Sequence, residues 1–191
     1  MPGSDIRNAL RQATMAAHRE LDEHPVVQAM VNGNVTRSQF EILLKEYAGW
    51  FSAWEPSVAT LHPEVVAELG EFRFEKSLWL AEDLERLGVD VPAAAQEIRA
   101  AEDGARLAGE LYVIEGSTLG GAAMMRSGKG FPSGANRFYE GYGARTGEAW
   151  MAMVAWLDGH VSGGAEVDRA CAAAVETFAV FRGFLDRAAG A

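Results

Sequence analysis

The feature that most constrains this chain is the helical spacing of its apolar residues. Near the N-terminus they recur at intervals of four, three, four and four residues, at Ile6, Leu10, Ala13, Ala17 and Leu21. This spacing places them on one face of an α-helix. No stretch alternates apolar and polar residues for long enough to predict a β-strand. The sequence therefore predicts an all-α protein.

Recognisable start and stop residues bound several of the expected helices. Residues 36–39 form a capping box that opens a helix through Phe51, and Pro56 should break or kink that helix. Gly88 is a typical helix stop, and Pro92 suits a first helical turn. The remaining helices are expected over residues 64–87, 92–125, 135–160 and 166–189, with loops over 127–134 and 159–164.

Length and composition favour a single domain spanning residues 1–191. Of these 191 residues 49% are hydrophobic, which suits one core and excludes intrinsic disorder. No run approaches the ~20 apolar residues of a membrane span, and the first residues lack the pattern of a signal peptide. The single cysteine, Cys171, excludes an internal disulfide and is expected to be a small buried hydrophobe. We therefore expect a soluble, cytoplasmic protein.

The overall charge is −10, which argues against a nucleic-acid partner because phosphate binding requires a basic face. Residues 116–147, here called the basic segment, run against this trend. Four basic residues against one acidic residue give it a local charge of +3: Arg126, Lys129, Arg137 and Arg145 against Glu140. The basic segment is either a solvated surface or a contact for an anionic ligand or an acidic partner.

Many familiar site motifs are absent from the sequence. It contains no GxxxxGKS/T or GxGxxG phosphate loop and no GxSxG nucleophile elbow. The zinc motif HExxH and the Glu-x-x-His pattern of di-iron bundles are missing too. No bound flavin or nicotinamide is therefore expected. Among the histidines, His18 is the one inside an amphipathic helix, whereas His24, His62 and His160 are typical of polar helix ends.

The first helix carries a polar face beside its apolar face. Arg11, Thr14, His18 and Asp22 are spaced three, four and four residues apart, so they lie on one side. Asp22 can accept a hydrogen bond from one imidazole nitrogen of His18, which leaves the other nitrogen for a metal. A flat ligand could then contact an iron-binding His and an anion-binding Arg. The alternative is an exposed helix edge with an ordinary His–Asp pair.

A second helix is interrupted by Gly116, Gly120 and Gly121. Three glycines inside a helix cost roughly 2.5–3 kcal/mol relative to alanine. Either close helix–helix packing or the close approach of the backbone to a bulky flat ligand could offset this cost. In the second case, backbone groups and the hydroxyls of Ser117 and Thr118 could orient water or a diatomic molecule. The glycines alone favour neither explanation.

Together these two helices resemble those of the haem (heme) oxygenase family, in particular its Gram-negative bacterial branch. Leu10-Arg-Gln-Ala-Thr-Met-Ala-Ala-His18 is similar to the family's proximal helix, in which a Thr precedes the iron-ligating His by four residues. Glu115-Gly-Ser-Thr-Leu-Gly-Gly-Ala-Ala-Met124 is similar to its distal helix. Phe138-Tyr-Glu-Gly-Tyr-Gly143 and Trp150 also have counterparts, so the resemblance spans most of the chain.

The resemblance implies a single-domain helical bundle with heme between a proximal helix near the N-terminus and a glycine-kinked distal helix. His18 would ligate the iron, with Asp22 in the place of the acid that supports it. The residues that match or lie near the family's propionate contacts are Arg11, Arg137 and, more weakly, Arg145 and Tyr112.

The distal helix matches the family in its glycines and departs from it at one position. Gly116, Gly120 and Gly121 match the glycines that let the backbone lie over the heme. Many family members carry an Asp directly after the first of these glycines, where this chain has Ser117. The bacterial branch often lacks that Asp, so the departure does not exclude activity.

The activity that the resemblance implies is the opening of heme to biliverdin, CO and Fe²⁺ with O₂. Heme would be both substrate and cofactor, and the protein would supply orientation and hydrogen bonds. The electrons would come from an external reductase or ferredoxin, for which the basic segment is a candidate docking patch. The alternatives are a heme or tetrapyrrole carrier of the same fold that does not degrade its ligand, a helical enzyme without heme, and a structural interaction protein.

Overall fold

The computed structural model describes residues 5–126 and 129–191, and within them every regular element is helical. The α-helices are α1 (Asp5–Asp22), α2 (Pro25–Asn32), α3 (Arg37–Leu61), α4 (Pro63–Leu69), α5 (Lys76–Leu87), α6 (Gly104–Met125), α7 (Arg137–Glu140), α8 (Thr146–His160) and α9 (Gly164–Ala189). The 3-10 helices are η1 (Glu71–Phe74), η2 (Pro132–Gly134) and η3 (Gly143–Arg145). The all-α prediction is confirmed.

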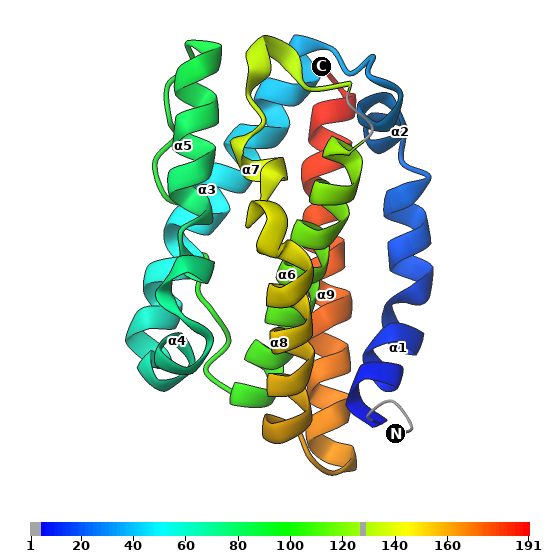
Figure 1. The fold of residues 1–191 in the computed structure, drawn as a ribbon, viewed down its shortest axis with the longest axis vertical. Coiled ribbons are helices and arrows are strands. Elements are labelled where there is room, and N and C mark those ends of the chain that lie inside the picture. Colours follow the sequence, from blue (N-terminus) through cyan, green and yellow to red (C-terminus); the bar gives the residue numbers. More distant parts are fainter. Residues whose placement is uncertain (1–4, 127–128) are drawn as a thin grey trace.

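The bundle is built around the pair α6 and α9, which run side by side along its long axis (Figure 1). Helix α1 lies on one side of this pair, and α3 and α5 lie on the other. At Gly109 the two central helices come so close that an added Cβ would lie 2.1 Å from the carbonyl oxygen of Ala170. Only glycine permits this approach, so Gly109 sets the spacing of α6 and α9.

Aromatic side chains of α3 fill the core between α3 and α9. The ring of Tyr47 makes edge contacts with Phe181 and Phe184, with 5.3 Å between the ring centroids in each pair. Because α3 buries residues along most of its length, packing holds it in helical form where its local sequence is unfavourable. This accounts for Pro56, which was expected to break or kink the helix and which lies inside a continuous α3 without breaking it.

Three expected helices are shorter or divided. Residues 64–87 are interrupted at Gly70, and residues 135–160 at Gly141, where φ values of +92° and +57° leave the helical region. The helix expected from residue 92 starts only at Gly104, because the carboxylate of Asp103 caps it by accepting a hydrogen bond from the backbone N–H of Arg106. Within residues 92–103 the chain instead bonds along α3, where the N–H of Ala95 donates to the carbonyl of Gly49.

Two of the predicted helix boundaries are confirmed. Thr36 forms the capping box with Gln39 at the start of α3, and Gly88 ends α5 in the left-handed conformation with φ 67°. Helices α1 and α9 cover the first and last expected helical segments. The expected loop 159–164 is shorter than predicted, because α8 extends to His160. Of the expected loop 127–134, residues 127–128 lie outside the described part of the chain, and residues 132–134 form η2.

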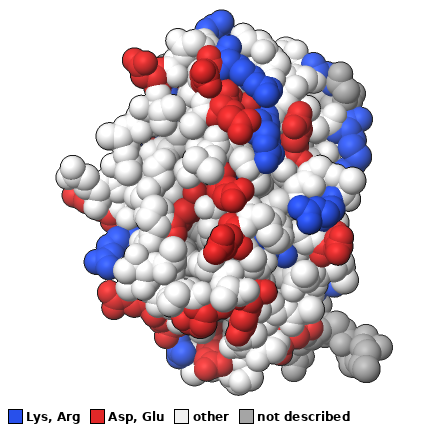
Figure 2. All heavy atoms as spheres, turned by 60° about the vertical axis from the view of Figure 1, so that its left-hand side comes forward, with Lys and Arg blue, Asp and Glu red and all other residues white. Residues whose placement is uncertain are grey.

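The surface is unevenly charged. Acidic side chains gather on the face that α4 and α5 form (Figure 2), where the exposed acidic residues include Glu64, Glu68, Glu71, Glu75, Glu82 and Glu85. In the same region Arg73 and Lys76 are buried, so they do not offset this charge at the surface. Among the described residues, none of the helices is both long and apolar enough to span a bilayer.

Candidate functional site

A cavity of about 640 Å³ lies between α1 and α6. Helices α2, α3 and α9 close its sides, and Tyr139 of α7 and Trp150 of α8 complete its lining. Most of the lining side chains are apolar. The structure brings together in this lining most of the residues that the sequence singled out, namely His18, Asp22, Tyr112, Gly116, Ser117, Gly120 and Gly121.

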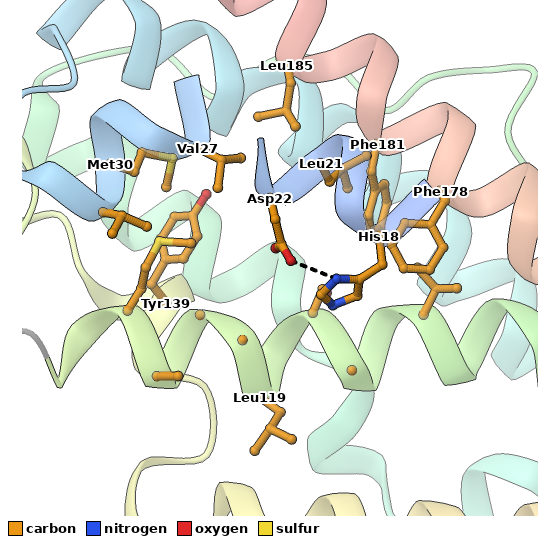
Figure 3. Close-up of a pocket in the computed structure, with 18 of the residues that line it drawn as sticks. His18, Leu21, Asp22, Val27, Met30, Leu119, Tyr139, Phe178, Phe181 and Leu185 are labelled. Carbon is orange, nitrogen blue, oxygen red and sulfur yellow. Dashed lines mark ion pairs between the residues drawn. The ribbon is translucent and has the colours of Figure 1, made fainter. Parts of the chain in front are cut away.

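His18 projects from α1 into this cavity, toward α6 (Figure 3). Its Nδ1 lies 2.9 Å from Oδ2 of Asp22, one turn further along the helix. A proton on Nδ1 donated to this carboxylate leaves Nε2 unprotonated, with its lone pair available to a ligand. The His18 side chain is 64% exposed, and the ring of Phe178 lies 5.9 Å from it between centroids. The imidazole is thus accessible and oriented.

Three glycines of α6, Gly116, Gly120 and Gly121, form the wall opposite His18, and they do so for different reasons. An added Cβ at Gly121 would lie 3.1 Å from the Tyr139 ring, so this glycine allows close packing of α6 on α7. At Gly116 the added atom would touch Trp150 at an ordinary 3.7 Å. At Gly120 it would meet nothing within 4 Å. Packing therefore explains Gly121, whereas Gly120 leaves bare backbone toward open space in the cavity.

The two hydroxyls next to Gly116 differ in position. Ser117 lines the cavity, and its hydroxyl donates to the carbonyl oxygen of Ile114 at 2.7 Å. Thr118 donates to the same oxygen at 3.0 Å but is buried against Gly141. Since its proton is used, the Ser117 oxygen can only accept a further hydrogen bond from the cavity. Of the two hydroxyls, only that of Ser117 reaches the cavity.

Tyr112 lines the cavity and is influenced by positive charges on α1. Burial raises the pKa of Tyr112, and a hydrogen bond with Thr14 and the charges of Arg7 and Arg11 oppose this shift. Arg11 is exposed on α1 and is not part of the cavity lining. The charge of Arg11 therefore acts on Tyr112 from outside the cavity lining.

Arg137 and Arg145 are not brought to the cavity, contrary to the expectation that they contact the ligand. The guanidinium of Arg137 lies 4.1 Å from the ring centroid of Trp79 and donates to the carbonyl of Gly141 at 3.0 Å. The guanidinium of Arg145 lies 5.5 Å from the ring centroid of Phe72. A planar guanidinium stacks well on aromatic faces, and these contacts hold both side chains on α5 and η1.

Two groups of residues at the site were not predicted. The cavity walls from α2, α3 and α9 include Met30, Tyr47 and Phe181, which in sequence look like ordinary core positions. A buried charged cluster behind the α6 wall joins Glu115 to Arg73 and Lys76. The sequence signal for this cluster is slight, since it consists of charged residues within apolar helical segments.

Fold and cavity define a helical bundle in which an oriented histidine faces a glycine-rich helix across an apolar pocket. Comparison with protein families matches residues 4–187 to the family described as heme oxygenase. The match covers nearly the whole chain, so the chain belongs to the heme oxygenase family. Comparison with curated proteins gives no match.

Solved structures show the same fold. The NO- and CO-bound heme oxygenase from Neisseria meningitidis has 22% identity and a TM-score of 0.75, over 97% of this chain and 92% of that chain. Heme oxygenase-1 from the cyanobacterium Synechocystis, in complex with heme, has 17% identity and a TM-score of 0.79, and the match covers 97% of this chain and 93% of that chain. At these identities the likeness concerns the fold, and the Gram-negative branch stays a prediction.

Proposed function

We propose that this protein is a heme-degrading oxygenase that opens heme to biliverdin, CO and Fe²⁺, using O₂ and electrons from an external donor. Heme is the substrate and lies between α1 and α6. One observation carries the proposal: Nδ1 of His18 is paired with Asp22, so that Nε2 is available on the side of the cavity that faces the glycines of α6. Heme supplies the oxygen-activating iron and the reactive ring when it is bound.

The residues of the cavity suit a flat apolar ligand. The walls of α1 and α6 face one another, and the absence of side chains at Gly116 and Gly120 lets a planar molecule approach the α6 backbone. Most of the surrounding side chains from α2, α3 and α9, including Met30 and Phe181, are apolar. A porphyrin ring buries a large apolar surface, so such a lining supplies most of its binding free energy.

In this proposal His18 would ligate the heme iron, and Asp22 would orient His18 through the bond to Nδ1. The carboxylate fixes the tautomer and orients the ring. Ser117 accepts a hydrogen bond at its oxygen from a water or ligand group in the cavity, because its own proton is donated to Ile114. Proton supply to the cavity would therefore pass through water molecules held at Ser117 Oγ and at the backbone of α6.

Arg11 is the basic residue that the proposal keeps as a partner for the heme carboxylates. Its charge is close enough to Tyr112 to affect the pKa of that phenol, and Tyr112 lines the cavity. The propionates would thus leave the cavity at the end formed by Thr14 and Tyr112. Arg137 and Arg145 take no part in this proposal, because their contacts with Trp79 and Phe72 hold them elsewhere.

Turnover of bound heme tests the proposal. The protein is loaded with hemin, ascorbate is added in air, and the absorption spectrum is followed. Loss of the Soret band with the appearance of a bilin spectrum and release of CO is the expected result. A complex that stays intact would favour the heme-carrier alternative, and no complex at all would refute both.

A further inference from the structure

Behind the α6 wall lies a fully buried cluster of charged side chains. The Arg73 guanidinium donates to one oxygen of Glu115 at 2.5 Å, and the Lys76 ammonium donates to the other at 3.0 Å. The hydroxyl of Tyr142 donates to the same oxygen as Lys76, at 2.7 Å. Arg73, Lys76 and Glu115 are only 3%, 1% and 2% exposed. The cluster therefore joins η1, α5 and the turn before η3 to one residue of α6.

This cluster is connected to the cavity at two places. Glu115 directly precedes Gly116, which lines the cavity opposite His18. The second guanidinium nitrogen of Arg73 donates to the carbonyl of Ala149 at 2.9 Å, and the next residue, Trp150, also lines the cavity and faces Gly116. A single guanidinium thus ties together the two segments, from α6 and α8, that make up this part of the wall.

The chemistry of the cluster makes it rigid. A buried carboxylate that accepts charge-assisted hydrogen bonds has one favourable position, because any displacement leaves buried charges without partners. Burial and the charge of Glu115 raise the pKa of Tyr142, so the phenol keeps its proton and continues to donate. Arg73 donates to three acceptors through its planar guanidinium, Glu115 and the carbonyls of Ala149 and Leu69, which a lysine ammonium would not reproduce.

We propose that Arg73, Glu115 and Tyr142 are positioning residues that hold Gly116 and Trp150 at the distance from His18 that a bound heme requires. This inference rests on the proposed function. None of the three lines the cavity, so they act through their neighbours in sequence and not by contact with the ligand. Without them, the α6 wall would become locally mobile and the heme pocket less well defined.

Three variants of the full chain test this role. Tyr142→Phe removes one hydroxyl and keeps the ring, whereas Glu115→Gln removes the charge and keeps the shape. Tyr142→Phe is the variant that remains informative if Glu115→Gln does not fold, because it leaves both ion pairs in place. Glu110→Gln is the matched control, since Glu110 also lies on α6, is partly buried and accepts a hydrogen bond from Trp54 at 2.8 Å, but does not line the cavity.

Two readouts distinguish positioning from general stability. Amide hydrogen exchange of the ligand-free protein should rise roughly tenfold or more over residues 112–121 in Tyr142→Phe and Glu115→Gln, as expected for the loss of a hydrogen bond to a charged group. In the hemin complex, the same variants should shift or broaden the Soret band. Glu110→Gln should change neither the amide exchange over residues 112–121 nor the Soret band. All variants are compared at the same number of degrees below their own melting temperatures.

The outcomes separate this inference from the proposed function. A normal wild-type hemin complex whose spectrum is unchanged in both cluster variants would overturn the positioning role alone. Exchange over residues 112–121 that matches the Glu110→Gln control would also overturn it. Failure of the wild type to bind hemin would refute the proposed function, and with it any positioning toward heme.

Discussion

At the scale of single residues, the glycines that line the cavity from α6 show how one residue type serves two purposes. Gly121 accommodates the Tyr139 ring, whereas Gly120 faces open space in the cavity. From sequence these roles were indistinguishable, because a helical glycine implies a close neighbour without saying whether it is a side chain or a ligand. The structure separates them through the surroundings of each absent Cβ.

Gly120→Ala should therefore stabilise the ligand-free protein but weaken hemin binding. Alanine is the better helix former by about 1 kcal/mol, and no neighbour opposes the added methyl group. We expect the melting temperature to rise by about 2–4 °C, while the methyl group between α6 and the ligand lowers hemin affinity. Calorimetry and hemin titration measure the two effects, and unchanged affinity would contradict the role of Gly120.

Gly121→Ala is the counterpart with the opposite expectation for stability. Its Cβ would lie 3.1 Å from the Tyr139 ring and 3.5 Å from backbone atoms of the same residue. Overpacking of this kind typically costs about 1–3 kcal/mol. A lower melting temperature of the ligand-free protein is expected, and a variant as stable as Gly120→Ala would contradict the packing explanation.

Asp22→Asn tests the support of His18. The substitution keeps the size of the side chain but replaces the charged acceptor of the imidazole proton. Loss of such a partner typically lowers the affinity of a histidine ligand for its metal by about 10- to 100-fold. We expect weaker binding of ferrous and ferric heme with little change in the stability of the ligand-free protein, since the pair is exposed. Wild-type affinity would show that Asp22 does not support His18.

At the scale of elements, the sequence predicted the helices that pack by their own amphipathic pattern, and it was less successful where tertiary contacts decide. Helices α1 and α9 match their predicted segments. Pro56 was expected to break or kink its helix, and α3 continues past it unbroken because the buried aromatic face of that helix outweighs the lost backbone hydrogen bond. The start of α6 was misplaced because Pro92 resembles a helix start, whereas the functioning cap is Asp103.

The site, like the fold, was predictable where its residues lie on regular helices and not where tertiary contacts decide. Helical spacing places His18 and Asp22 on one face, the family resemblance singled out this pair and the glycines as site residues, and all of them line the cavity. Arg137 and Arg145 lie in the irregular segment around α7 and η3, where helical periodicity gives no guide to side-chain direction. The buried cluster of Glu115 depends on contacts between residues about 40 positions apart, which no local pattern reveals.

Asp103 allows a test of how α6 begins. Asp103→Ala should cost about 1 kcal/mol at neutral pH, the usual value of an N-cap side chain. The hydrogen bond from the backbone N–H of Arg106 and the neighbouring Arg169 lower the pKa of Asp103 from 3.8. Its contribution to stability is therefore present above pH 3.8 and is lost as the pH falls through the lowered value. Denaturant titrations should show the difference from wild type shrinking below about pH 4, and a constant difference would contradict this cap.

At the scale of the whole molecule, the charge distribution limits where an acidic electron donor could dock. The α4–α5 face is acidic (Figure 2), so it would repel such a donor. Within the basic segment, Arg137 and Arg145 stack on Trp79 and Phe72. Arg126 is exposed at the end of α6, and Lys129 contacts Asn32 beside the cavity wall of α2.

Charge reversal tests this docking surface. Arg126→Glu combined with Lys129→Glu should slow reductase-driven turnover several-fold and weaken its dependence on ionic strength, because both residues would steer an acidic donor. Arg145→Glu is the control, because it also reverses a positive charge but at a residue that packs on Phe72 of η1. Ascorbate-driven turnover should stay the same in all variants. An unchanged reductase-driven rate and salt dependence would exclude this surface.

The central claim, that His18 binds heme iron through Nε2, is tested most directly by a hemin titration followed in the Soret region. Wild type, His18→Ala and His160→Ala are compared, the last because His160 is an exposed histidine that stacks on Trp156 outside the cavity. We predict a one-to-one complex for wild type and His160→Ala, an altered spectrum and weaker binding for His18→Ala, and restoration of the wild-type spectrum by added imidazole. A wild-type spectrum in His18→Ala without imidazole would contradict the account.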